Sequence, residues 1–68
     1  MKNNIKVERA KRNLTQAKLA ELAMVSRQTI NAMESGKYVP STVLALRLSK
    51  IFDVPVNEMF YLENSDWE

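Results

Sequence analysis

Residues 14 to 31 read LTQAKLAELAMVSRQTIN, and this stretch decides how the chain folds. Thr15 and Ser26 each stand directly before a segment whose apolar residues have helical spacing. A hydroxyl side chain in that position caps the exposed amides of a helix's first turn. We therefore expect one helix over residues 16–23 and another over residues 27–35, separated by a short break.

The two expected helices can cross closely, because Ala20 supplies a small side chain where they meet. Val25 and Ile30 would then fill the inside of the unit. Two short helices joined by a tight turn form a helix-turn-helix, whose second helix enters the major groove of DNA. Base edges in that groove are read by short polar or basic side chains near the start of the helix. The side chains that meet this need are Ser26, Arg27, Gln28 and Asn31.

The rest of the chain is also expected to be helical for most of its length. Gly36, the only glycine, suits the left-handed residue that ends a helix, and Asn13 can do the same. The segment 61–63 could be extended, and the residues from 64 onward, apart from Trp67, are expected to fray. The further helices that we expect run from Asn3 or Asn4 to about residue 12, from 42 to 52 with Ser41 as cap, and from 56 to 60.

Composition limits what such a chain can do. Its 68 residues allow one small domain, and 46% hydrophobic with 26% charged residues is the balance of a globular protein. The absence of Cys and His removes disulfides, the commonest general base and the commonest metal ligand. We therefore expect no enzyme, no metal site, no cofactor and no evident small-molecule ligand. Without a long apolar run or a signal-peptide core, we expect a cytoplasmic protein with no membrane partner.

The charge balance permits a nucleic-acid partner without proving one. The net charge is +2 and the isoelectric point is about 9.2. Three of the cations, Lys6, Lys11 and Arg12, have two interpretations. They are either charges that keep the chain in solution or contacts at the rim of a nucleic-acid backbone.

Four segments in fixed order resemble the Cro/C1-type (Xre-like) helix-turn-helix repressors. They read LTQAKLA at 14–20, VSRQTIN at 25–31, ESGKYVPS at 34–41 and FDVPVNEMF at 52–60. The resemblance covers roughly residues 3 to 62 and is strongest to compact single-domain members, including the cytolysin repressor type. It implies an all-α, five-helix, lambda-repressor-like DNA-binding domain over residues 1–62, with a short C-terminal β-strand as an option and a tail at 63–68.

The resemblance also implies which side chains face the bases. Arg27 would suit the O6 and N7 atoms of guanine, and Gln28 would suit the N6 and N7 atoms of adenine. Ser26 is expected at a base and Thr29 at a phosphate, although either hydroxyl could touch either group. Asn31 lies one turn further along the same face and could read a base or brace a neighbour.

Other matched positions imply contacts with the DNA backbone and one internal ion pair. Gln16, at the start of the first helix of the unit, would bond a phosphate with help from the positive end of that helix. Lys37 and Tyr38, in the loop after the recognition helix, would hold the backbone. Arg9 and Glu34 occupy positions that form a buried ion pair in family members, with a structural role.

Two positions depart from the family pattern. Met24 stands at a turn position that is often Gly, and Met in the left-handed region would cost about 1 kcal/mol unless the turn takes another form. Ala32 stands where some relatives carry a long polar side chain that reads a base. The preferred DNA sequence therefore cannot be copied from a relative.

Apolar residues near the C-terminus predict a surface between two copies of the chain. Leu46 and Val43 fall off the main apolar stripe of their helix, and Met59, Tyr61 and Leu62 follow further on. Together they would form a self-complementary patch for a two-fold dimer. The extended segment at 61–63 could pair with the same segment of the partner.

The sequence thus favours a sequence-specific, double-stranded DNA-binding regulator that acts as a homodimer. Each copy would place one recognition helix in a major groove, on inverted half-sites about 34 Å apart. Repression by blocking a promoter is what the family implies, with activation as the alternative. Two other classes stay open, namely a module that binds only proteins and a small enzyme built on carboxylates and Lys.

Overall fold

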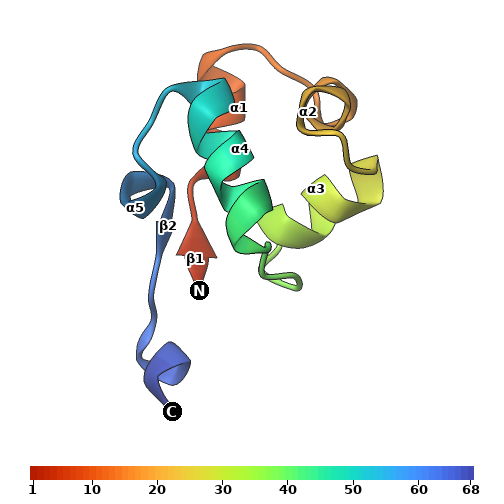
Figure 1. Cartoon of the computed structure of the whole chain (residues 1–68). Helices are drawn as coiled ribbons and strands as arrows, with labels where there is room; N and C mark the ends of the chain where they lie inside the picture. Colours follow the sequence, from red (N-terminus) through yellow and green to blue (C-terminus); the bar gives the residue numbers. More distant parts are fainter.

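The computed structural model describes all residues from 1 to 68. It contains five α-helices and a two-stranded antiparallel sheet (Figure 1), which confirms the helical class expected from the sequence. None of the helices combines the length and the apolar character that crossing a bilayer requires. In chain order the elements are β1 (Lys2–Asn3), α1 (Ile5–Lys11), α2 (Gln16–Ala23), α3 (Arg27–Glu34), α4 (Thr42–Phe52), α5 (Val56–Met59), β2 (Phe60–Tyr61) and a short 3-10 helix, η1 (Asn64–Trp67).

Hydroxyl caps begin three of the helices where the sequence predicts them. The side chains of Thr15, Ser26 and Ser41 each accept a hydrogen bond from the amide three residues further on, at 3.0, 3.1 and 3.2 Å. Such a cap contributes about 1 kcal/mol, because it satisfies an amide that has no partner within the helix. Of the two candidates for α1, the side chain of Asn3 is the one that bonds, at 3.2 Å from the Ile5 amide.

Left-handed residues end four of the helices. They are Asn13, Met24, Gly36 and Asp53, with φ between 54° and 78°. In each case the amide of this residue bonds the carbonyl three residues back, and the next amide bonds the carbonyl five residues back. This pair of bonds is the Schellman motif, which satisfies the carbonyls at a helix end. The sharp reversals between helices therefore have a purely local cause.

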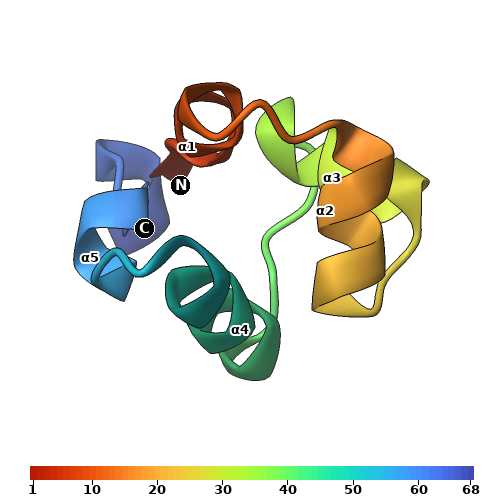
Figure 2. The same cartoon turned by 90° about the horizontal axis from the view of Figure 1, so that it is seen from above.

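The core receives side chains from all five helices and from β2. Seen from above, the helices surround this centre (Figure 2). Burial of such side chains from water is the main favourable term in folding. The eleven buried hydrophobic residues are Ile5, Leu19, Ala20, Ala23, Ile30, Met33, Leu44, Leu48, Phe52, Met59 and Phe60.

Arg12 closes α1 against the end of α4. Its guanidinium carbon lies 5.0 Å from the centroid of the Phe52 ring, a cation–π distance, and it also bonds the Phe52 carbonyl. Arg12 and Lys11 both donate to the carboxylate of Glu8, at 2.9 and 3.2 Å. Both cations are thus paired with a carboxylate of the chain itself.

The small sheet joins the two ends of the chain. Lys2 pairs with Tyr61 and Asn3 with Phe60. This pairing occupies one edge of β2, so pairing of the segment 61–63 with a second copy stays a prediction for the other edge. The pairing of β1 with β2 could not be predicted from the sequence, because β1 has only two residues and lies almost sixty residues before β2.

The tail is ordered, contrary to the prediction that it frays. The amide of Glu63 donates to Asp66 at 2.7 Å, and this hydrogen bond lowers the pKa of Asp66. The N-terminal ammonium group of Met1 lies 2.9 Å from the Asp66 carboxylate and 3.3 Å from that of Glu63. Reciprocal bonds of the capping-box type begin η1, so the tail is held by its own side chains together with the Met1 ammonium group.

We predict that Met24→Gly stabilises the protein. Met24 has φ 60° and ψ 42°, and a left-handed residue with a Cβ is strained by about 1 kcal/mol or more. Its side chain is 72% exposed, so little packing is lost with it. Urea unfolding should show a net gain of up to about 1 kcal/mol, because glycine's greater freedom in the unfolded chain offsets about 0.5–1 kcal/mol of the relieved strain. Met24→Ala keeps the strained backbone and should show no gain, and an equal gain there would contradict the explanation.

Candidate nucleic-acid interface

The unit formed by α2 and α3 has the close crossing that the sequence predicts. Ala20 is buried where α2 approaches α3, and Ile30 is fully buried on the inner side of α3. Val25, in the turn, packs against the core. Because these residues fix the inside of the unit, the opposite side of α3 is left for polar groups.

The outer side of α3 carries exposed polar side chains, two of which have no partner within the chain. Arg27 and Gln28, in the first turn, are exposed and form neither a side-chain hydrogen bond nor an ion pair. Asn31 is exposed one turn further on. The buried side chains of α3, Ile30 and Met33, lie on the other side of the helix. This arrangement leaves the donors and acceptors of Arg27 and Gln28 available to a ligand.

Two hydroxyl groups stand together at the start of α3. The Ser26 hydroxyl accepts from the Thr29 amide at 3.1 Å, and the two hydroxyl oxygens lie 3.0 Å apart in a second hydrogen bond. Ser26 is exposed and Thr29 is half-buried. Both groups therefore help to form the helix start, and each oxygen retains capacity for a further bond.

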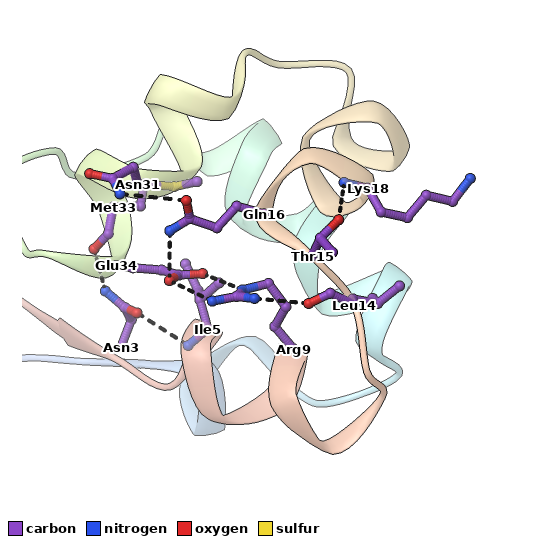
Figure 3. Close-up of polar contacts among 10 residues, drawn as sticks. All are labelled: Asn3, Ile5, Arg9, Leu14, Thr15, Gln16, Lys18, Asn31, Met33 and Glu34. Carbon is purple, nitrogen blue, oxygen red and sulfur yellow. Dashed lines mark hydrogen bonds and ion pairs between the residues drawn. The ribbon is translucent and has the colours of Figure 1, made fainter.

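A largely buried ion pair ties α1 to the end of α3. The Nε and Nη2 atoms of Arg9 donate to the two carboxylate oxygens of Glu34, at 2.8 and 3.1 Å (Figure 3). The third donor, Nη1, bonds the carbonyl of Leu14 at 2.8 Å. The exposed fractions of the two side chains are 17% for Arg9 and 7% for Glu34. The hydrogen bonds to Glu34 raise the pKa of Arg9, whose guanidinium is always charged in proteins.

Gln16 extends this ion pair toward the outer surface. Its Nε2 atom donates to Glu34 at 3.1 Å, and its Oε1 atom accepts from Asn31 at 3.5 Å. Figure 3 shows Gln16 between these two residues, with the amide nitrogen toward Glu34 and the oxygen toward Asn31. The residue expected at a phosphate and one expected at a base are thus joined by a direct contact.

Lys6 is a candidate that the sequence interpretation left undecided. It lines a small hollow together with Gln16, Asn31, Glu34 and Ser35, and it has no ion-pair partner. The sequence does hold a signal for this placement, because Lys6 precedes Arg9 by three residues and shares its side of α1. Its neighbours Lys11 and Arg12, by contrast, turn to Glu8.

The loop after α3 begins from a fixed point. Gly36 bonds back onto α3, and the Asn3 side chain donates to the Met33 carbonyl at 2.8 Å. Lys37 and Tyr38 follow, and both are exposed. Neither takes part in a side-chain hydrogen bond with the rest of the chain. The ammonium group of Lys37 and the phenol of Tyr38 are therefore accessible close to the end of α3.

The predicted dimer surface needs one correction. Met59 is fully buried in the core, because α5 turns its side chain inward, so it cannot contact a second copy. Leu46 and Leu62 are more than half exposed, as is Val43. Tyr61 lies on the opposite face of β2 from Phe60, since neighbouring strand residues alternate. Leu46 shares an apolar hollow with Val39, Pro40, Ala45, Val56 and Phe60.

Comparisons with known proteins agree with this architecture. A family model described as helix-turn-helix matches residues 5–59, from the start of α1 to the end of α5. The chain is 48% identical over 66 residues to an uncharacterised HTH-type transcriptional regulator of Methanocaldococcus jannaschii, and 44% identical over 66 residues to the uncharacterised HTH-type transcriptional regulator YgzD of Bacillus subtilis. Each of these matches spans 97% of this chain and 100% of the relative.

A further match is to a longer protein. The HTH-type transcriptional activator BcrR of Enterococcus faecalis is 43% identical over 51 residues, which is 75% of this chain and 25% of that protein.

We predict that Arg9→Met lowers stability far more than the loss of a surface ion pair does. The substitution leaves the largely buried Glu34 carboxylate with Gln16 as its remaining donor. Removing one partner of a fully buried pair typically costs about 3–5 kcal/mol, so that figure is the upper limit of the expected loss. Lys18→Met is the matched control, because Lys18 forms an exposed pair with Glu21 at 3.5 Å that is worth about 0.5 kcal/mol. Urea unfolding measures both. The double variant Arg9→Met with Glu34→Leu should recover part of the loss, and a fully stable Arg9→Met protein would refute the structural role.

Proposed function

This chain belongs to the helix-turn-helix family of DNA-binding transcriptional regulators, and we propose that it binds an inverted-repeat operator as a homodimer and represses transcription there. The observation that carries the proposal is the outer side of α3. Arg27 and Gln28 lie there without a partner inside the chain. They are the first two residues of the helix that enters the major groove in this family. Two unpaired polar side chains at the start of this helix are better explained as groups that contact DNA than as ordinary surface residues.

Base recognition is assigned to the start of α3. Arg27 offers a fork of donors that fits the two acceptors of guanine, and Gln28 offers one donor and one acceptor that fit adenine. Each such pair discriminates by about 1–3 kcal/mol. Ser26 and Asn31 are the further base contacts in this proposal.

Backbone contacts surround this reading surface. Gln16 and Thr29 would bond phosphates beside the helix starts, and Lys37 and Tyr38 would do so from the loop after α3. We add Lys6, because it lies beside Gln16 and Asn31 and its charge is not used by an internal pair. Phosphate contacts supply most of the affinity, and those made by Lys37 and Lys6 make it fall with salt, because a cation that neutralises a phosphate releases bound counterions.

The homodimer rests on exposed apolar surface. Leu46 and Leu62 lie outside the core although they are large and apolar, and Val39 and Val43 are 60% exposed. A 68-residue chain buries only about 60% of its unfolded surface, so a second copy would add stability. Two copies related by a two-fold axis would read inverted half-sites about 34 Å apart.

The direction of regulation has two candidates. Repression follows where the operator overlaps a promoter, because the bound dimer excludes polymerase. Activation is the alternative, since the similar part of BcrR belongs to a protein named as an activator. Transcription in vitro from a template that carries the selected operator, with and without the protein, decides between them.

We predict that Gln28→Ala relaxes the preference at one position of each half-site. The loss on the specific sequence should be about 1–3 kcal/mol, with little change on random DNA. Lys37→Ala is the matched comparison and should weaken all sequences alike, reducing the slope of log affinity against log salt by about one unit. Fluorescence anisotropy over a salt series measures both. An equal loss of Gln28→Ala on random DNA would contradict base reading.

We predict that Leu46→Glu converts a dimer into a monomer. The new carboxylate would lie in the apolar contact between copies and would have to lose its water there. Val7→Glu is the control, because Val7 is 52% exposed on α1 and outside the proposed surface. Sedimentation equilibrium gives the mass of each species, and circular dichroism confirms folding. A wild-type protein that binds its operator as a monomer would remove the dimer from the proposal.

A further inference from the structure

Four side chains form one continuous row from the inside of the domain to its outer surface. Arg9 donates to both oxygens of Glu34, Gln16 donates to Glu34 at 3.1 Å, and Asn31 donates to Gln16 at 3.5 Å (Figure 3). The row begins at a side chain that is 17% exposed and ends at an exposed one on α3.

The chemistry of Glu34 fixes the direction of every bond in this row. A carboxylate can only accept, and here it accepts from Arg9 on both oxygens. The amide of Gln16 must therefore turn its nitrogen toward Glu34, which leaves its oxygen facing Asn31. Asn31 must in turn direct its nitrogen toward Gln16. The oxygen of Asn31 then points away from the row, as Figure 3 shows.

We propose that Gln16 determines sequence specificity by orienting the amide of Asn31 for adenine. With its orientation fixed, Asn31 presents Oδ1 as an acceptor and its second N–H as a donor, which matches the N6 amino group and N7 of adenine. Guanine and thymine place the acceptors O6 and O4 in the groove, and these would face the Asn31 oxygen without a proton between them. The inference rests on the proposed function, because it requires α3 to lie in the major groove.

The proposal separates two roles for one side chain. Gln16 is also assigned to a phosphate, so its simple removal would lower affinity and selectivity together. Gln16→Lys divides them, because the lysine ammonium can still donate to Glu34 and to a phosphate but offers no acceptor to Asn31. Under the proposal its affinity for random DNA rises at low salt, since a charge is added, while its preference for adenine falls.

The experiment is selection of bound sequences from a random duplex pool by four proteins. These are the wild type, Asn31→Ala, Gln16→Lys and Gln16→Met, the last as a variant of similar length without an amide. Asn31→Ala should erase one adenine from each half-site. Gln16→Lys and Gln16→Met should each lower the ratio of adenine to thymine at that position by about fivefold or more. The positions assigned to Arg27 and Gln28 should keep their preferences.

Each result has a defined meaning. Full adenine preference in Gln16→Lys and Gln16→Met overturns the proposal, and so does an equal loss at every position, which would make Gln16 a general support of the fold. Unchanged selection by Asn31→Ala overturns it as well, while the function of the protein stands. A wild type that selects no sequence overturns the proposed function instead. Urea unfolding of each variant confirms that the folded protein was tested.

Discussion

The ion pair between Arg9 and Glu34 is the constraint on which the DNA-facing geometry depends. The helix that carries Glu34, α3, has eight residues, and a helix this short is unstable alone in water. A buried ion pair adds little net stability over a well-packed apolar pair, because both ions lose water. Its directional bonds instead fix where α3 ends relative to α1. The Ser26 cap fixes the other end, so α3 is held at both termini.

Ion pairs within the chain also determine which charges remain without a partner. Several carboxylates are bound by cations of the same chain. Glu34 is bound by Arg9, and the hydrogen bonds of Arg12 and Lys11 lower the pKa of Glu8. These ion pairs consume cations together with acids, so the charges without a partner decide where the net charge of +2 is located. The cations without internal ion pairs near α3 and its flanking segments include Lys6, Arg27 and Lys37. A modest total charge can thus still give a basic surface, because the acids without an ion pair, Asp53, Glu58 and Glu68, lie at the end of α4, on α5 and in the tail rather than on α2 or α3.

Sequence signals were sufficient wherever the cause is local. Ser26 and Ser41 cap the amide three residues ahead, and Gly36 ends a helix by its own backbone freedom, so adjacent residues fix the helix bounds. Signals failed where distant segments meet. The β1–β2 pairing joins the two ends of the chain, and the burial of Met59 depends on how α5 packs. The contact of Gln16 with Asn31 likewise requires the crossing of α2 over α3, which no spacing along the sequence reveals.

The row of side chains from Arg9 to Asn31 bears on how affinity and selectivity are related in so small a domain. A phosphate contact and a base contact are usually separate, the first setting position and the second reading sequence. Here Gln16 would serve the first and fix the orientation of the second, and both depend on a carboxylate that is 7% exposed. A displacement of α2 along the DNA backbone would then also disturb the reading of a base. Only one register of the protein on its operator would satisfy both contacts, so selectivity arises from a rigid connection as well as from matching donors and acceptors.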